Sequence, residues 1–492
     1  MFVRFGPQNY PGREQMRLRW CVVTLAVMLV AAGCGSGKTV NEGLSGSSTT
    51  IASGGGGNNA STPTAPEICK TAKLTSPEIG VSPSTITVTV MADTGSPIKP
   101  GLFQGSVDAV KAWANYVNDN GGLACRKVAV NVIDSKLDPQ ASKNGIATAC
   151  GNSLAMVGTT ALFLQDVSPL ENCKDKAGNS HTFTDIAELQ TEPAQQCSPE
   201  SFATLPPGYS CPYSGSGLRK FQVGYTTMDY YKKQFPGLAL HGTFVIPKDL
   251  SSTIEATMVL FRAENQMGVK SDAEIGMSGL ATQPDYTAVA DAIKAHNSNY
   301  ARNGTDYSGT LYMRKEAQAQ GVTSVKIWDC SVQCYDKRLL AGGSATEGQY
   351  VWLNILPMED GNANPELASF LKYDTKPDGF GEQAWVAGEI FATAVRNAMS
   401  ANNNDPNAIT RANVLAAVKN LHSFDANGMV PTIDVGAKVG STCLVGMQIK
   451  NGKFVRVDPL LPGKFDCDLD PTTGQPKPPL TFTIDPLKEY HG

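Results

Sequence analysis

Hydrophobic and polar positions follow two alternating periods in the first part of the folded region. The stretch STITVTVMADTGSP places Ile86, Val88 and Val90 at period two ahead of turn-forming residues, which predicts a strand and a loop. GSVDAVKAWANYVNDNGG then repeats its apolar residues at helical spacing and stops at two glycines, as an amphipathic helix does. RKVAVNVID, PQASKNGIATAC and SLAMVGTT follow as strand, helix and strand. This order predicts a parallel sheet with right-handed crossovers.

The same alternation restarts near residue 240. HGTFVIPKD, ATMVLFRAE and SVKIWDC have the composition of strands, and DYTAVADAIKAHN and TLYMRKEAQAQG have helical spacing. Two long amphipathic helices follow in EQAWVAGEIFATAVRNAM and TRANVLAAVKNL, the second with Thr410 as its expected N-cap. We therefore expect an α/β protein with two lobes.

Ligands of open parallel sheets bind at the carboxyl ends of the strands. In the first lobe this rule selects two loops. One runs from Asp93 to Ser96 and includes Thr94, and the other runs from Thr159 to Phe163.

Composition limits the classes of partner. The chain has 492 residues, 41% of them apolar and 17% charged, and a net charge of −4. This balance favours a globular protein and points to neither nucleic acid nor an anionic membrane surface. Without a leader and a linker, about 420 residues remain to fold, which is more than one hydrophobic core usually holds.

The N-terminus has the pattern of an export signal. Residues 1–20 carry four arginines and one acid, and the apolar run CVVTLAVMLVAAG follows, too short for a permanent membrane-spanning helix. AAGCGSGKTV loosely matches a nucleotide-binding loop, but no strand precedes it and no helix follows it, so the phosphate-binding interpretation fails. Residues 34–79 are rich in Gly, Ser and Thr, as flexible linkers are.

VAAGC, which ends at Cys34, resembles the lipobox of bacterial lipoprotein precursors. On that resemblance residues 1–33 are a lipoprotein signal peptide, Cys34 is lipidated, and the mature protein is anchored to the membrane in the cell envelope. Ala31 stands where the usual pattern has leucine, so an ordinary secretory signal cut near Ala32 is the alternative.

The cysteine count fits an exported chain. Of twelve cysteines, Cys21 lies in the leader and Cys34 at the lipid site, which leaves ten, enough for five disulfides. A metal site is disfavoured because there is no C-x₂-C pair and the five histidines are scattered. The expected local pairs are Cys330 with Cys334 and Cys443 with Cys467, and Cys125 and Cys150 are further disulfide candidates.

The order of motifs resembles the substrate-binding proteins of branched-chain amino acid ABC transporters. The motifs run from residue 80 to residue 458: VMADTGSP, NYVNDNGGLACRKVAVNVID, the step Asp134, Asp138 and Pro139, the pair Val157 and Gly158, GSATEGQYVWLNILP, DGFGEQAWVAG, FDANGMV and IKNGKF. The resemblance implies the type I periplasmic-binding fold, two doubly wound parallel-sheet lobes joined by a three-crossover hinge. It assigns 80–222 with 345–442 to lobe 1, 223–344 with 443–470 to lobe 2, and 471–492 to a C-terminal tail.

The same resemblance implies ligand contacts. Hydroxyls of Thr159 and Thr160 would hold a ligand carboxylate, with Ala161 beside them where the family has a small polar residue. Thr191 would supply a second hydroxyl. In lobe 2, Tyr307 would offer an aromatic contact, and Asp329 lies near the position that binds an α-ammonium group in the family.

The implied function is that of a receptor for an ABC importer, without enzymatic activity, cofactor or metal. It would capture one small polar solute, an amino acid or amide-like compound, and present it to permease and ATPase subunits as a monomer. A sensor of the same fold that feeds a signalling partner is the alternative within binding proteins. An extracytoplasmic hydrolase is disfavoured because no histidine lies near a G-x-S-x-G stretch.

The lipobox makes the first testable prediction. Cys34→Ser should release the protein into the medium or leave it as uncleaved precursor, because two or more acyl chains are what give stable anchoring. Fractionation and immunoblotting measure this. Unchanged processing and membrane retention would contradict the lipoprotein interpretation.

Overall fold

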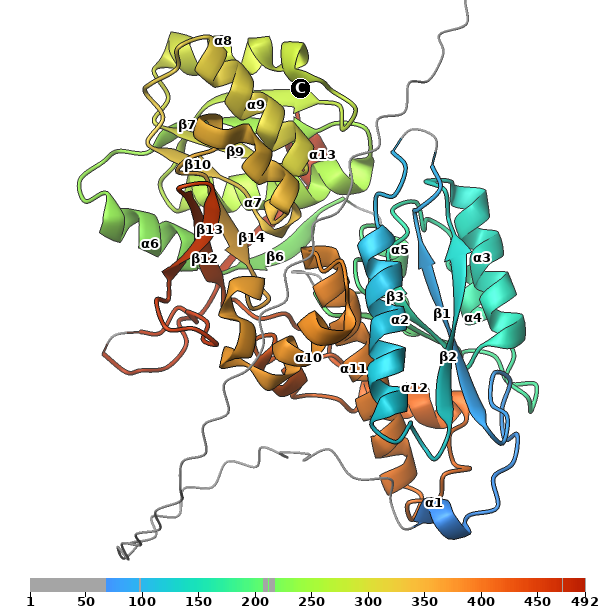
Figure 1. Cartoon of the computed structure of the whole chain (residues 1–492). Coiled ribbons are helices and arrows are strands. Elements are labelled where there is room, and N and C mark those ends of the chain that lie inside the picture. Colours follow the sequence, from blue (N-terminus) through green and yellow to red (C-terminus); the bar gives the residue numbers. More distant parts are fainter. Residues whose placement is uncertain (1–67, 97–98, 207–210, 212–216, 471, 492) are drawn as a thin grey trace, which may run out of the picture. The chain divides into compact units, whose positions relative to one another are not determined.

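A computed structural model describes residues 68–96, 99–206, 211, 217–470 and 472–491 (Figure 1). The predicted signal peptide, Cys34 and most of the linker lie outside these residues. The described chain begins with the short helix α1 (Ile68–Thr71).

The first sheet has the strand order β2-β1-β3-β4-β5, and every neighbouring pair is parallel. The strands are β1 (Thr85–Ala92), β2 (Lys127–Asp134), β3 (Ala155–Thr159), β4 (Thr184–Ala187) and β5 (Ser201–Ala203). Helices α2 (Gln104–Asp119) and α3 (Pro139–Asn152) connect the first three strands as the pattern predicts. The short helices α4 (Ser168–Glu171) and α5 (Pro193–Cys197) belong to the later connections.

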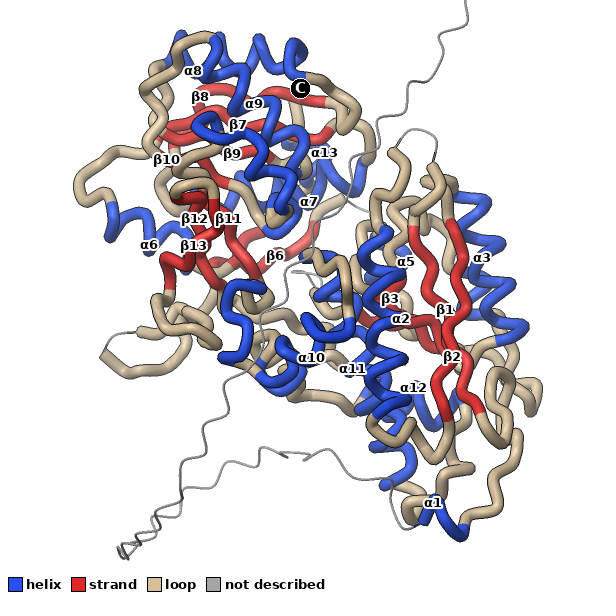
Figure 2. The backbone as a smooth tube through the Cα atoms, viewed as in Figure 1, coloured by secondary structure: helices blue, strands red, loops and turns tan. Residues whose placement is uncertain are grey.

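The two faces of this sheet are covered by different helices (Figure 2). Val88 and Val90 pack in one core with α2 and with α11 (Gly379–Ser400), whereas Met91 packs in another with α3. Period-two alternation requires this division, because successive side chains of a strand point to opposite faces. The next helix, α12 (Arg411–Lys419), has the predicted cap, since the Thr410 side chain accepts from the Asn413 amide.

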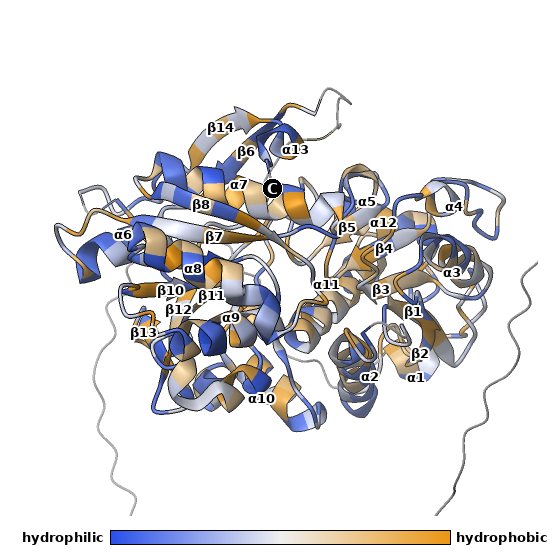
Figure 3. Ribbon diagram, turned by 90° about the horizontal axis from the view of Figure 1, so that it is seen from above, coloured by the Kyte–Doolittle hydropathy of each residue, from blue (hydrophilic) through white to orange (hydrophobic). Residues whose placement is uncertain are grey.

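The second sheet has the order β10-β9-β7-β8 and is also parallel. Its strands are β7 (His241–Pro247), β8 (Lys270–Met277), β9 (Tyr300–Asn303) and β10 (Ile327–Asp329). Phe244 and Ile246 face α7 (Ser251–Gln266), while Val245 faces α8 (Thr287–His296) and α9 (Tyr307–Ala319). In Figure 3, strand β7 is coloured mainly as hydrophobic and lies between α7 and α8, which carry both hydrophobic and hydrophilic residues.

The predicted strand ATMVLFRAE is wrong, because these residues belong to helix α7. The apolar run is too short to distinguish a strand from a buried helix. In the longer window Ile254, Met258 and Phe261 recur at helical spacing, and all three are buried against the sheet.

Antiparallel strands complete the described chain. β6 (Arg219–Val223) pairs with β14 (Leu480–Ile484), and β11 (Tyr350–Leu353), β12 (Val445–Lys450) and β13 (Lys453–Asp458) form a three-stranded sheet. The segment predicted as a C-terminal tail therefore contributes a strand. The lobe boundaries stay a prediction. The remaining α-helices are α6 (Thr226–Gln234), α10 (Pro365–Tyr373) and α13 (Pro486–Glu489). Among the described helices, none has the length and apolarity to cross a membrane.

Five disulfides use all ten cysteines of the described residues. Cys330 bonds Cys334 and Cys443 bonds Cys467, as predicted. The other bridges join Cys69 to Cys125, Cys150 to Cys173 and Cys197 to Cys211.

The disulfide set predicts that the folded domain after residue 67 has no free thiol. Alkylation before reduction should leave its mass unchanged, and alkylation after reduction should label ten cysteines. Two or more thiols labelled without reduction would contradict the full set.

Buried acids make stability depend on pH. Burial raises the pKa of Glu264, Glu389 and Asp458 to about 7 each. Carboxyl groups of an unfolded chain titrate near 4. Between pH 5 and 7 the folded state therefore binds more protons than the unfolded state, and the free energy of unfolding must fall as the pH rises.

The melting temperature should accordingly be higher at pH 5.5 than at pH 7.5, by on the order of a few degrees. Scanning calorimetry at both values checks this. A melting temperature that stays constant or rises with pH over this interval would show that these acids do not control stability.

Candidate functional site

Asp93 holds together the carboxyl edge of the first sheet. Its fully buried carboxylate accepts hydrogen bonds from the Ser135 hydroxyl at 2.7 Å, the Leu137 amide at 2.7 Å and the Leu162 amide at 2.8 Å. These donors lie in the loops after β2 and β3, whereas Asp93 directly follows β1. One carboxylate therefore fixes three loops at the edge where a solute is expected.

The motif of Asp134, Asp138 and Pro139 supports the same edge. Asp134 accepts from the amides of Thr94 and Gly95 at 3.1 and 3.0 Å. Partial burial opposes the charge, but these backbone donors hold the pKa of Asp134 below its usual value. Asp138 caps helix α3 through the Ala141 amide, with Pro139 at the first helical position. The motif therefore positions the loop that contains Thr94.

The hydroxyls predicted to hold a ligand are bonded internally. Thr159 donates to Asp185 at 2.6 Å, Thr160 to the Gly158 carbonyl at 3.2 Å, and Thr191 to the Leu162 carbonyl at 2.9 Å. Thr159, Thr160, Ala161 and Ser96 are buried, and Thr94 and Thr191 are half-buried. Their role as solute contacts stays a prediction. Each threonine hydroxyl, however, already donates its proton within the protein.

Asp329 ends strand β10 inside a buried ionic network. Its Oδ2 accepts from Arg302 at 2.7 Å and from the Tyr300 hydroxyl at 2.6 Å. Arg302 also forms an ion pair with Glu264 and donates to the Ser331 hydroxyl at 2.5 Å. Asp329 is 0% exposed, and its Oδ1 has no partner among the described residues. A solute ammonium would share this carboxylate with Arg302, and the role of Asp329 as a ligand contact stays a prediction.

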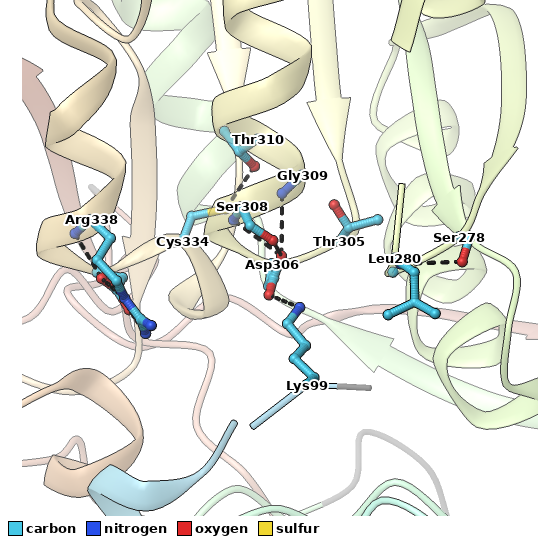
Figure 4. Close-up of polar contacts among 12 residues, drawn as sticks. Lys99, Ser278, Leu280, Thr305, Asp306, Ser308, Gly309, Thr310, Cys334 and Arg338 are labelled. Carbon is cyan, nitrogen blue, oxygen red and sulfur yellow. Dashed lines mark hydrogen bonds and ion pairs between the residues drawn. The ribbon is translucent and has the colours of Figure 1, made fainter. Parts of the chain in front are cut away.

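Tyr307 is the first residue of α9, and its ring is covered by a cation. The Arg338 guanidinium lies 4.2 Å from the ring centre, and Arg338 also pairs with Asp336. The preceding residue, Asp306, caps the helix through the Ser308 and Gly309 amides (Figure 4).

Lys99 connects the two halves of this region. Lys99 lies in the connection between β1 and α2, at the carboxyl edge of the first sheet. Its ammonium forms an ion pair with Asp306, which lies in the loop after β9 of the second sheet (Figure 4). The side chains are 28% and 19% exposed. The carboxyl edges of the two sheets therefore contact each other directly at this pair.

Two cavities open beside these edges. The larger, of about 1350 Å³, lies along the antiparallel strands and includes Arg302, Ser331, Trp352, Val430 and Thr442 in its wall. The smaller, of about 340 Å³, has a wall of charged and aromatic side chains. They are Tyr335, Asp336, Lys337, Arg338, Glu359, Lys376, Asp378 and Phe454, with Met358 and Pro377. The smaller volume lies within the usual range of small-molecule sites, and the larger one exceeds it.

Sequence reasoning missed two further acids, of which only Asp378 lies in the wall of the smaller cavity. Asp378 caps α11, its carboxylate accepts from the Gly381 amide at 2.7 Å, and it lies so close to Gly105 that a Cβ there would stand 2.2 Å from its oxygens. Glu188 follows β4 and is fully buried, with no partner for either carboxyl oxygen in the described part of the chain. Asp378 was visible in the motif DGFGEQAWVAG, but nothing in the sequence singled out Glu188.

Among the described residues, no group of three or more His, Cys, Asp or Glu side chains converges as a metal ion requires.

Comparison with known proteins identifies the fold. Residues 262–453 match a protein family described as periplasmic binding protein. No curated protein matches the chain in sequence.

Three solved structures illustrate the structural similarity. An ABC transporter substrate-binding protein of Aeropyrum pernix is 15% identical, with a TM-score of 0.59 over 80% of this chain and 97% of that chain. A fatty acid ABC transporter substrate-binding protein of Thermomonospora curvata is 17% identical, with a TM-score of 0.59 over 77% and 92%. The leucine-binding protein LivK of Thermotoga maritima is 14% identical, with a TM-score of 0.56 over 76% and 97%.

These matches confirm the resemblance that the motifs predicted: the chain has the type I periplasmic-binding fold of ABC transporter substrate-binding proteins, and residues 262–453 carry the sequence signature of the periplasmic binding protein family.

Proposed function

We propose that this protein is an extracytoplasmic solute-binding receptor of an ABC importer. It captures one small polar solute, an amino acid or amide-like compound, where the two carboxyl edges meet, and presents it to a membrane permease. The family match and the fold support the receptor role. The leucine named for one similar structure supports a small organic solute, and the fatty acid named for another shows that the fold serves different ligands.

The ion pair between Lys99 and Asp306 carries this proposal. It joins a loop of one parallel sheet to a loop of the other at the edges where such sheets bind ligands. A solute that contacts both edges binds the closed arrangement better than an open one, and it shifts the population by that difference in affinity. The closed form is then a signal that a permease can recognise.

The remaining features of the proposal follow from the receptor role. The protein binds without turnover, is tethered through Cys34, and works as a monomer with permease and ATPase subunits. Incubation with generic ester and amide substrates should give no hydrolysis.

A thermal-shift screen tests solute binding. A ligand specific for the folded state stabilises it by about 2.7 kcal/mol at a hundredfold excess over Kd, which raises the melting temperature by a few degrees. At least one compound among amino acids, amides, polyamines and small aromatic compounds should do so. If none of these classes shifts the transition at millimolar concentration, the proposed solute class is wrong.

Lys99→Gln should weaken the binding of any such solute about two- to fivefold, because a partly exposed ion pair that supports closure is worth up to about 1 kcal/mol. Lys143→Gln is the matched control. It breaks the ion pair of Lys143 with Asp166, which lies within the first-sheet half at 2.6 Å. Calorimetric titration measures both. Equal effects of the two variants would refute the role of Lys99 in closure.

A further inference from the structure

The loop after strand β13 presents two neighbouring leucines to solvent. Leu460 and Leu461 are 78% and 62% exposed, the highest values among the large apolar side chains that the structure describes. The aromatic residues on either side of the loop behave differently, because Phe454 is buried in the core of the first sheet and Phe465 packs against that core. Single exposed apolar residues are normal on a protein surface, so the way this pair is held decides whether it has a role.

A buried ion pair holds the loop from within. Arg456 of β13 donates to the carbonyl oxygen of Pro459 at 3.0 Å and to that of Lys464 at 2.8 Å, so it ties both ends of the loop. Arg456 is paired with Asp360, whose carboxylate also accepts from the Gly463 amide at 2.7 Å. The two charged side chains are 8% and 3% exposed. The fold thus fixes this loop through its backbone and uses neither leucine to do so.

The loop is therefore preorganised, and its two apolar side chains are not needed for packing. A loop that is held through its backbone places no packing demand on Leu460 and Leu461, so the fold itself does not require leucine at either position. Exposed apolar side chains of this size favour contact with an apolar environment. Because the backbone is already ordered, such a contact loses little conformational entropy when it forms.

The exposed charges around the pair are mainly positive. Lys464 closes the loop and Lys453 begins β13, and both are exposed. Of the neighbouring acids, Asp458 and Asp466 are partly buried at the base of the loop, and Glu347 accepts from the amides of the β12–β13 turn. Leucines flanked by lysines are typical of segments that lie in a membrane interface, where the apolar side chains enter the acyl region and the ammonium groups stay among the headgroups.

The small size of the pair favours a membrane over a protein partner. A specific protein interface buries about 800 Å² on each side, far more than two leucines expose. A membrane contact needs less area, because a tethered domain meets the surface at a high effective concentration. Residues 35–67 separate Cys34 from α1, and these 33 residues span at most about 110 Å. With the proposed lipid anchor, the loop therefore stays within reach of the bilayer.

We infer that Leu460 and Leu461 insert into the bilayer to which the protein is anchored, with Lys453 and Lys464 among the lipid headgroups. The net charge of −4 does not favour an anionic surface, so insertion of the leucines supplies the attraction and the lysines select the face that turns toward the lipid. The contact goes beyond the proposed receptor function, since it gives the tethered domain a fixed orientation on the membrane.

Quenching by brominated lipid tests the insertion in the anchored full-length protein. Leu461→Trp places an indole at the tip of the loop, and Leu280→Trp is the matched control, because Leu280 is a leucine that is 56% exposed in the loop after β8. In vesicles of brominated phosphatidylcholine and phosphatidylglycerol, the emission that Leu461→Trp adds to the wild-type signal should shift to the blue and be strongly quenched, whereas that of Leu280→Trp should not. Equal emission of the two variants without quenching would overturn the inference.

A chain that begins at residue 35 separates insertion from the anchor. It should bind vesicles of the same two lipids in sedimentation assays, and joint Leu460→Ser and Leu461→Ser substitution should weaken this binding about tenfold or more. Leu280→Ser should leave it unchanged. The double variant should keep the wild-type melting temperature, because neither leucine packs in the core.

Two results would overturn the inference and leave the receptor function standing. One is binding only to vesicles that also contain the permease, which would make the loop a protein contact. The other is a wild-type chain that ignores vesicles but forms dimers in ultracentrifugation, which the double substitution abolishes.

Discussion

The loops at the two carboxyl edges depend on buried carboxylates that already have partners. Asp93 accepts from donors in two further loops of the first sheet, and Asp329 is paired with Arg302 in the second. Removing one partner of such a group would leave a buried charge without compensation, which is expensive. These acids therefore shape the edges, and a solute must be recognised by groups that the framework does not consume.

Three of the hydroxyls predicted to contact a solute belong to this framework. The hydroxyls of Thr159, Thr160 and Thr191 donate to acceptors within the fold, as structural hydroxyls do. Glu188 is the opposite case, since its buried oxygens have no donor in the described structure. A buried acid without a partner is a costly feature, and such features occur at functional sites more often than elsewhere.

Much of the fold follows from local pattern. Strand β1 and helix α2 were predictable because their apolar positions repeat over many residues, and Cys330 and Cys334 because they are close in sequence. Helix α7 was not predictable, since a run of nine mostly apolar residues fits both the strand and the helix period. Strand β14 was not predictable either, because its partner β6 lies more than half the chain length away in sequence. The site was harder still. The ion pair of Asp329 with Arg302 depends on how the fold brings strands β9 and β10 side by side, which residue spacing does not reveal.

Closure on binding tests the central claim most directly. Lys99 and Asp306 join the carboxyl edges of the two sheets, and a solute that contacts both edges favours that closed arrangement. Small-angle X-ray scattering, with and without a solute that raises the melting temperature, measures the change. The account predicts a smaller radius of gyration when the solute is bound. A radius of gyration that stays the same on binding would contradict it.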